Sequence, residues 1–136
     1  MTTRSVRLEW TGRGLVFEGS AHEGPRVVLD SDGREGPSPT QALLLSLAGC
    51  MGVDVVMILE KSRVPVQSLS VEVEGDRAEE VPRRFTSIRM VYRIAGPGEE
   101  NRKKVERAVD LSRDRYCSVL HTLRTDLDWE IRVDLV

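Results

Sequence analysis

The chain is poor in aromatic residues, in cysteine and in net charge, and these shortages exclude several classes of protein. Aromatic side chains make up 4% of the 136 residues, so the core must be built from aliphatic groups. Twenty Lys and Arg residues stand against 22 Asp and Glu residues, which leaves no broad positive field to attract nucleic acid. The sequence also lacks a glycine-rich phosphate loop and a Ser-His-Asp triad. Nucleic-acid binding is therefore a poor first hypothesis.

The first ten residues, MTTRSVRLEW, contain neither the apolar segment of a signal peptide nor an Arg/Ser-rich transit pattern. We therefore expect a cytoplasmic protein, and the length predicts a single domain over residues 1–136. In a reducing compartment the two cysteines, Cys50 and Cys117, are better candidates for free, catalytic or metal-binding thiols than for a structural disulfide. Their surroundings decide among these alternatives.

Hydrophobic periodicity predicts an α+β fold of three strands, a long helix, two strands, two helices and a final strand. Alternation of apolar and polar residues marks the strands, and glycines in TGRG supply the first hairpin turn. The predicted strands cover 5–11, 14–20, 26–30, 66–75, 85–94 and 127–136. The predicted helices cover 39–62, 99–115 and a short segment that begins near Cys117.

The long helix is the most informative predicted element. Ser38 can cap it, Pro39 suits its first position, and Gln41 completes a capping box. Its interior is apolar on all sides except for Ser46, Asp54 and the Cys50 thiol, so it belongs in a core or a bilayer. Its shortness and its acidic residue argue against a membrane span. The other apolar elements are too few to wrap it completely, which predicts a homodimer whose interface contains the helix.

The two cysteines differ in their expected environments. Cys50 lies mid-helix among Ala48, Gly49 and Gly52, which leave room for a substrate or another backbone; the alternative is a buried structural cysteine. Cys117 follows a charged segment and can lie at a helix N-terminus, where backbone amides favour a thiolate. Spacing alone does not tell whether the two thiols meet.

Asp54 lies one helical turn after Cys50 and should share its face. A charged carboxylate there would oppose formation of a thiolate, so we expect Asp54 to be buried and to pair with an Arg or to cap a contact. On that interpretation, Asp54→Ala would cost about 3 to 5 kcal/mol of stability, because an ionic partner would be left uncompensated.

A metal site is a weaker alternative. His22, Cys50, Cys117 and His121 could together form a two-cysteine, two-histidine zinc site. Neither cysteine has a second ligand at C-x-x-C spacing, and His22 lies in a glycine-rich turn. We therefore expect no metal and no other cofactor.

Two stretches resemble a known family. GPSPTQALLLSLAGCMGVDVVMIL, followed some sixty residues later by RYCSVLHTL, is similar to the OsmC/Ohr family of osmotically inducible protein C and organic hydroperoxide resistance proteins. The resemblance covers essentially the whole chain and is closest to a less characterised OsmC-like branch. It implies antiparallel sheets around a long buried central helix in an intertwined homodimer. It also implies reduction of organic hydroperoxides, with Cys50 as peroxidatic thiol, Cys117 as resolving thiol and an external dithiol as reductant.

The sequence departs from the family pattern at one place. Peroxidases of the family carry a Glu ten residues before the first cysteine, and it pairs with an Arg that holds the thiolate. Here that position is Thr40, followed by Gln41, and the nearest candidate cation is Arg34. These three residues are candidates for binding substrate or activating the thiol. The alternative function is a small-molecule-binding dimer of the same fold without significant peroxidase activity.

Overall fold

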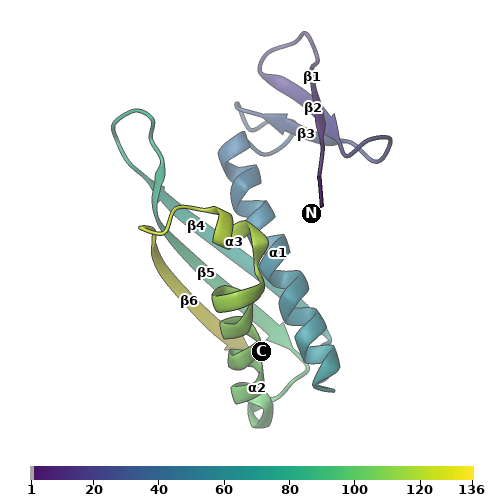
Figure 1. The fold of residues 1–136 in the computed structure, drawn as a ribbon, viewed down its shortest axis with the longest axis vertical. Helices are drawn as coiled ribbons and strands as arrows, with labels where there is room; N and C mark the ends of the chain where they lie inside the picture. Colours follow the sequence, from purple (N-terminus) through teal and green to yellow (C-terminus); the bar gives the residue numbers. More distant parts are fainter. Residues whose placement is uncertain (1) are drawn as a thin grey trace. The chain divides into compact units, whose positions relative to one another are not determined.

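A computed structural model describes residues 2–136 (Figure 1). The chain divides after Leu43 into two compact units. The N-terminal unit contains an antiparallel sheet in the order β1-β2-β3. Its strands are Arg7–Trp10, Val16–Ser20 and Val27–Asp30, within or at the edges of the predicted ranges.

The loop after β3 is organised by one buried carboxylate. The side chain of Asp30 accepts hydrogen bonds from the backbone N–H groups of Asp32 at 2.9 Å, Arg34 at 3.2 Å and Glu35 at 3.1 Å. These backbone bonds, first among them that from Asp32, hold the pKa of Asp30 below its usual value. A sequence rich in Gly, Pro and Ser therefore forms an ordered loop.

Helix α1 spans Pro39–Lys61 and begins with the predicted capping box. The backbone N–H of Gln41 donates to Ser38 Oγ at 3.3 Å, and the Gln41 side-chain oxygen accepts from the Ser38 N–H at 2.9 Å. The predicted start of the helix is confirmed, and its end differs by one residue.

The C-terminal unit packs helices on a three-stranded sheet in the order β4-β5-β6 (Figure 1). The strands are Ser68–Arg77, Phe85–Ala95 and Asp128–Leu135. The connection from β5 to β6 holds a short 3₁₀ turn, η1 (Glu99–Asn101), helix α2 (Arg102–Leu111), a π-helical turn, η2 (Ser112–Tyr116), and helix α3 (Ser118–Thr122).

The second sheet is not antiparallel throughout, in contrast to the antiparallel sheets that the family resemblance implies. β4 pairs with β5 antiparallel, whereas β5 pairs with β6 parallel, so the sheet is mixed. The physical reason is the helical connection between β5 and β6, which is long enough to return the chain to the same end of the sheet. Alternation of residues identifies strands but does not fix their relative direction.

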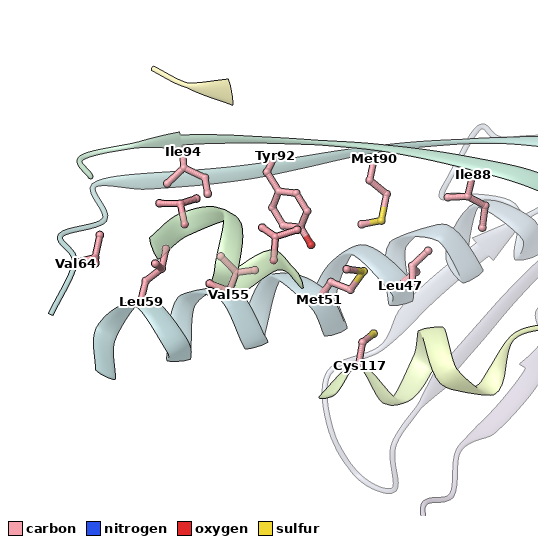
Figure 2. Packing of buried hydrophobic residues seen from close by; sticks show 13 residues of the cluster. Leu47, Met51, Val55, Leu59, Val64, Ile88, Met90, Tyr92, Ile94 and Cys117 are labelled. Carbon is pink, nitrogen blue, oxygen red and sulfur yellow. The ribbon is translucent and has the colours of Figure 1, made fainter. Parts of the chain in front are cut away.

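The core lies between α1 and the central strand β5. Figure 2 shows four residues of α1 facing four alternate residues of β5. The α1 residues recur every fourth position, as one face of a helix requires. Both sets are at most 2% exposed: Leu47, Met51, Val55 and Leu59 from α1, and Ile88, Met90, Tyr92 and Ile94 from β5.

The opposite side of α1 carries an apolar stripe that this chain leaves exposed. Leu45 is 60% exposed, Val53 59% and Met57 58%. These three residues, called the α1 stripe below, recur at multiples of four positions along one helix face. By length and composition α1 would also suffice to cross a membrane, a criterion that core helices of soluble proteins meet as well. The helix is buried on one face only within the chain, and not on every side.

Candidate functional site

Cys50 lies on α1 between the buried core face and the α1 stripe, and its side chain is half-buried. Its glycine neighbours leave the space that the sequence predicts. A Cβ atom placed on Gly49 would meet nothing within 4 Å, and one placed on Gly52 would only touch Leu69 at 4.0 Å. The surroundings of Cys50 therefore leave room for another group to approach the helix beside it.

Cys117 is the N-cap of α3, as its predicted position at a helix N-terminus requires. Its sulfur accepts a hydrogen bond from the backbone N–H of Leu120 at 3.3 Å, and its own N–H donates to the carbonyl of Ser112 at 2.9 Å. The side chain is fully buried in the hydrophobic core. Capping and burial together fix the direction of this thiol.

The fold brings the two thiols together. The side chains of Cys50 from α1 and Cys117 from the start of α3 lie close enough to interact, and both are free thiols. Burial raises the pKa of Cys117 to about 11; the Leu120 N–H opposes this shift, and the contact with Cys50 adds to it. The amide of a short helix is thus outweighed by desolvation, and Cys117 is protonated at neutral pH.

This protonation predicts slow alkylation of Cys117. In a Cys50→Ala variant, where burial remains the largest cause of the raised pKa, iodoacetamide should react at pH 7.5 at least about 100-fold more slowly than with the same chain unfolded in urea. The rate should rise about tenfold per pH unit toward pH 11. Mass spectrometry of the alkylated peptide measures the rate. Equal rates in folded and unfolded chains would contradict the buried, protonated thiol.

A small polar cluster lies beside the thiols. Asp54 is half-buried and accepts a hydrogen bond from the hydroxyl of the buried Ser112 at 2.8 Å. The hydroxyl of Tyr92 is also buried and has no hydrogen-bond partner among the described residues. Burial, followed by the nearby Cys117 and Asp54, raises the pKa of Tyr92. Tyr92 therefore presents a neutral, unused donor in the interior near Cys117 and Asp54.

Of the two alternatives predicted for Asp54, pairing with an Arg is wrong: its carboxylate instead accepts a hydrogen bond from the neutral Ser112 of another element. Asp54→Ala should therefore lower the free energy of unfolding by about 1 to 3 kcal/mol, the cost of leaving a buried hydroxyl without its acceptor. Asp54→Asn keeps an oxygen acceptor and is the matched control, with a smaller loss. Urea denaturation measures both variants, and unchanged stability of Asp54→Ala would show that this bond contributes nothing.

The remaining predicted site residues lie in the N-terminal unit. Arg34 donates its backbone N–H to Asp30, and its side chain is exposed. Thr40 places its hydroxyl 3.3 Å from Ser38 Oγ, and Gln41 serves the capping box. In this structure Gln41 caps the start of α1. A role of Arg34, Thr40 or Gln41 in binding substrate or activating the Cys50 thiol stays a prediction.

The alternative of a zinc site gains no support from the described residues. Within residues 2–136, no group of three or more His, Cys, Asp or Glu side chains is placed to hold a metal ion. His22 lies near the hydroxyl of Ser5, with its ring Nε2 3.4 Å from Ser5 Oγ. Cys117 and His121 are neighbours on α3, where their backbone groups form a helical hydrogen bond.

Sequence reasoning missed Ser112 and Tyr92. The alternating pattern of β5 places Tyr92 on its inward face, but no pattern links that strand to the thiols. Ser112 is one of several polar residues in a charged segment, and its burial follows from the π-helical turn that succeeds α2. Both positions depend on tertiary packing.

The sequence profile of the family described as OsmC-like protein matches residues 31–132, which include both cysteines. The chain belongs to the OsmC-like protein family. Among similar proteins, YhfA from Escherichia coli (strain K12) is 39% identical over 115 residues, 84% of each chain. A solved structure of a hypothetical protein from Aquifex aeolicus VF5 has a TM-score of 0.87 and 31% identity, and the match covers 100% of this chain and 98% of that one.

The OsmC-like fold is shared with proteins named for hydroperoxide resistance. The organic hydroperoxide resistance protein OhrB of Bacillus subtilis has a TM-score of 0.66 and 14% identity, with coverage of 97% of this chain and 98% of that one. This likeness concerns the fold. The predicted family and the α+β OsmC-like architecture are confirmed.

Proposed function

We propose that this OsmC-like protein is a thiol-dependent peroxidase that reduces organic hydroperoxides through a two-cysteine cycle. The observation that carries the proposal is the contact between the Cys50 and Cys117 thiols, which come from separate elements and are both reduced. Two free cysteines of a small chain placed in contact are suited to forming and breaking one disulfide. Membership of a family whose fold neighbours include hydroperoxide resistance proteins supports the same conclusion.

In the proposed cycle the Cys50 thiolate attacks the terminal peroxide oxygen. The O–O bond breaks, the alkoxide takes a proton and leaves as an alcohol, and Cys50 becomes a sulfenic acid. The Cys117 sulfur then attacks the Cys50 sulfur, so that water leaves and a disulfide forms. An external dithiol reduces the disulfide by exchange and is itself oxidised, which returns both cysteines to thiols.

The order of the two cysteines follows from their environments. Cys50 is half-buried beside open space at Gly49, so a hydroperoxide can approach it. Cys117 is fully buried, and its pKa of about 11 keeps it protonated at neutral pH. A protonated thiol is a poor first nucleophile but can resolve a sulfenic acid with which it is already in contact.

Steady-state consumption of cumene hydroperoxide, with dithiothreitol or a lipoylated reductant, tests the proposed activity. We expect turnover of the organic hydroperoxide to exceed that of hydrogen peroxide, since the core around the thiols is apolar. Thr40, at the position where family peroxidases have a Glu, favours the alternative of a small-molecule-binding dimer. Negligible turnover of every hydroperoxide together with retention of a ligand would support that alternative and reject the peroxidase.

The active form is proposed to be a cytoplasmic homodimer. The α1 stripe supports this assembly, because three large apolar side chains on one helix face stay 58–60% exposed in the single chain. An apolar surface of this kind on a core helix is typical of a protein–protein interface. A second copy of the chain could cover the stripe symmetrically.

A further inference from the structure

The Cys117 thiol must lose its proton before its sulfur can complete a disulfide, and its surroundings oppose that loss. The side chain is 0% exposed, and burial raises the pKa of the thiol to about 11. At neutral pH about one such thiol in ten thousand is ionised. A fully buried thiol also cannot pass its proton directly to bulk water, so a neighbouring group of the protein has to take it.

The titratable neighbours of Cys117 in the described part of the chain narrow the choice of that group. Cys50 on α1 is the sulfur under attack, and the hydroxyl of Tyr92 on β5 is neutral because burial raises its pKa. His121 follows Cys117 by one turn on α3, but its side chain is exposed. Asp54 on α1 acts electrostatically on both Cys117 and Tyr92. Its carboxylate is the member of this set best suited to accept a proton.

Asp54 is linked to both thiols through the fold. It follows Cys50 by one turn of α1, so the two side chains share a helix face. Its carboxylate accepts a hydrogen bond from the hydroxyl of the buried Ser112 at 2.8 Å. The carbonyl of the same Ser112 accepts the backbone N–H of Cys117 at 2.9 Å. Ser112 therefore fixes the carboxylate and the resolving cysteine relative to each other.

The carboxylate of Asp54 keeps the capacity to bind a proton. The Ser112 hydroxyl occupies Oδ2, and within residues 2–136 no hydrogen bond to Oδ1 is formed. The side chain is half-buried, so it is held in place by its neighbours without being enclosed in the core. An oxygen that no donor occupies can take a proton and return it within the same step.

We propose that Asp54 carries the proton from one cysteine to the other when the disulfide forms. As the Cys117 sulfur attacks the Cys50 sulfur, its S–H proton passes to the Asp54 carboxylate and the S–O bond of the sulfenic acid breaks. The departing hydroxide takes that proton from Asp54 and leaves as water. The carboxylate is restored, and no further reactant is consumed. This step rests on the two-cysteine cycle proposed above.

The charge of Asp54 alone would have the opposite effect. Its negative charge is one of the causes that raise the pKa of Cys117. If the carboxylate were only a charged neighbour, Asp54→Asn would increase the thiolate fraction of Cys117 and speed its attack. Loss of a proton acceptor predicts a slower attack instead. Asn keeps an oxygen that accepts from Ser112, so the direction of the change in rate separates the two roles.

Dithiodipyridine tests the step without any hydroperoxide. Cys50 displaces one thiopyridone from this reagent, and attack by Cys117 on the mixed disulfide displaces the second. In Asp54→Asn the first release should not slow, whereas the second should slow at least about 100-fold at neutral pH, the lower end of general acid–base effects. Asp110→Asn is the matched control: it removes an exposed carboxylate 3.4 Å from Arg113 and should leave both releases unchanged.

The pH dependence of the second release gives a further readout. In Asp54→Asn only the Cys117 thiolate already present can attack, so the rate should rise about tenfold per pH unit toward pH 11. The wild type should show a shallower rise, because Asp54 takes the proton during the attack. The wild-type release should also be slower in deuterium oxide than in water. This last measurement needs no variant to fold.

A second release in Asp54→Asn as fast as that of the wild type, a single release by the wild type, or equal wild-type rates in deuterium oxide and water would each overturn the proposal. An equal slowing in Asp110→Asn would also overturn it, since any lost carboxylate would then suffice. Turnover of cumene hydroperoxide is measured separately. Its absence, together with a slow second release in Asp54→Asn alone, would reject the peroxidase and leave the proton transfer standing.

Discussion

Replacing Cys50 by serine is expected to reduce hydroperoxide consumption at least about a thousandfold, the scale of loss seen when an enzyme's nucleophile is removed. A serine hydroxyl is not ionised at neutral pH, and the remaining thiol, Cys117, has a pKa of about 11. The buried Cys117 should stay largely unreacted in this variant, since a resolving thiol needs a sulfenic acid to attack. Peroxide consumption and a free-thiol assay measure both outcomes.

The Cys117→Ser variant should behave differently from Cys50→Ser. It should consume about one equivalent of organic hydroperoxide and then retain a sulfenic acid at Cys50, which dimedone labels and which excess peroxide oxidises further. Continued turnover would then depend on direct reduction of that sulfenic acid by added dithiol. If Cys117 in the Cys50→Ser variant oxidised as fast as Cys50 does in Cys117→Ser, the assigned roles of the two thiols would be wrong.

A charge placed on the α1 stripe should have the second largest effect. Val53→Glu would bury an unpaired carboxylate in the proposed interface, and the desolvation of such a charge costs several kcal/mol. At about 1.4 kcal/mol per tenfold change, the dimer Kd should rise by at least about a thousandfold. Sedimentation equilibrium at micromolar concentration should show a dimer for the wild type and a monomer for Val53→Glu.

Val81→Glu is the matched control for this substitution. Val81 lies in the turn between β4 and β5, is 87% exposed and is not on the α1 stripe, so its replacement should leave the oligomeric state unchanged. If Val53→Glu fails to fold, the weaker Met57→Lys variant should still show a raised dimer Kd. A wild-type chain that is a stable, folded monomer at micromolar concentration would contradict the proposed dimer.

The sequence predicted most elements because their signals are local. Alternation of apolar residues marked both hairpins, and Ser38 with Gln41 marked the start of α1. The direction of β6 could not be predicted, because a parallel pairing depends on the path of the chain through α2 and α3. The same holds for the one-sided burial of α1, which depends on how much of the chain packs against it.

In the candidate site, too, the sequence predicted the features with local signals and missed those that depend on tertiary packing. Two cysteines in two recognisable contexts were sufficient to select Cys50 and Cys117, but only the fold showed that they touch. The Ser112 partner of Asp54 and the unpartnered hydroxyl of Tyr92 come from elements distant in the sequence, so no spacing could reveal them. The raised pKa of Cys117 reverses the expectation from its capping position, because burial has the larger effect.

One equivalent of cumene hydroperoxide, added to the fully reduced wild-type protein, tests the central claim most directly. The account predicts loss of both free thiols and, on peptide mapping by mass spectrometry without reductant, a disulfide that joins Cys50 to Cys117 within one chain. Such a bond requires Cα atoms about 4.4 to 6.8 Å apart. Two free thiols that persist after the hydroperoxide is added, or a disulfide only between chains, would contradict the two-cysteine cycle.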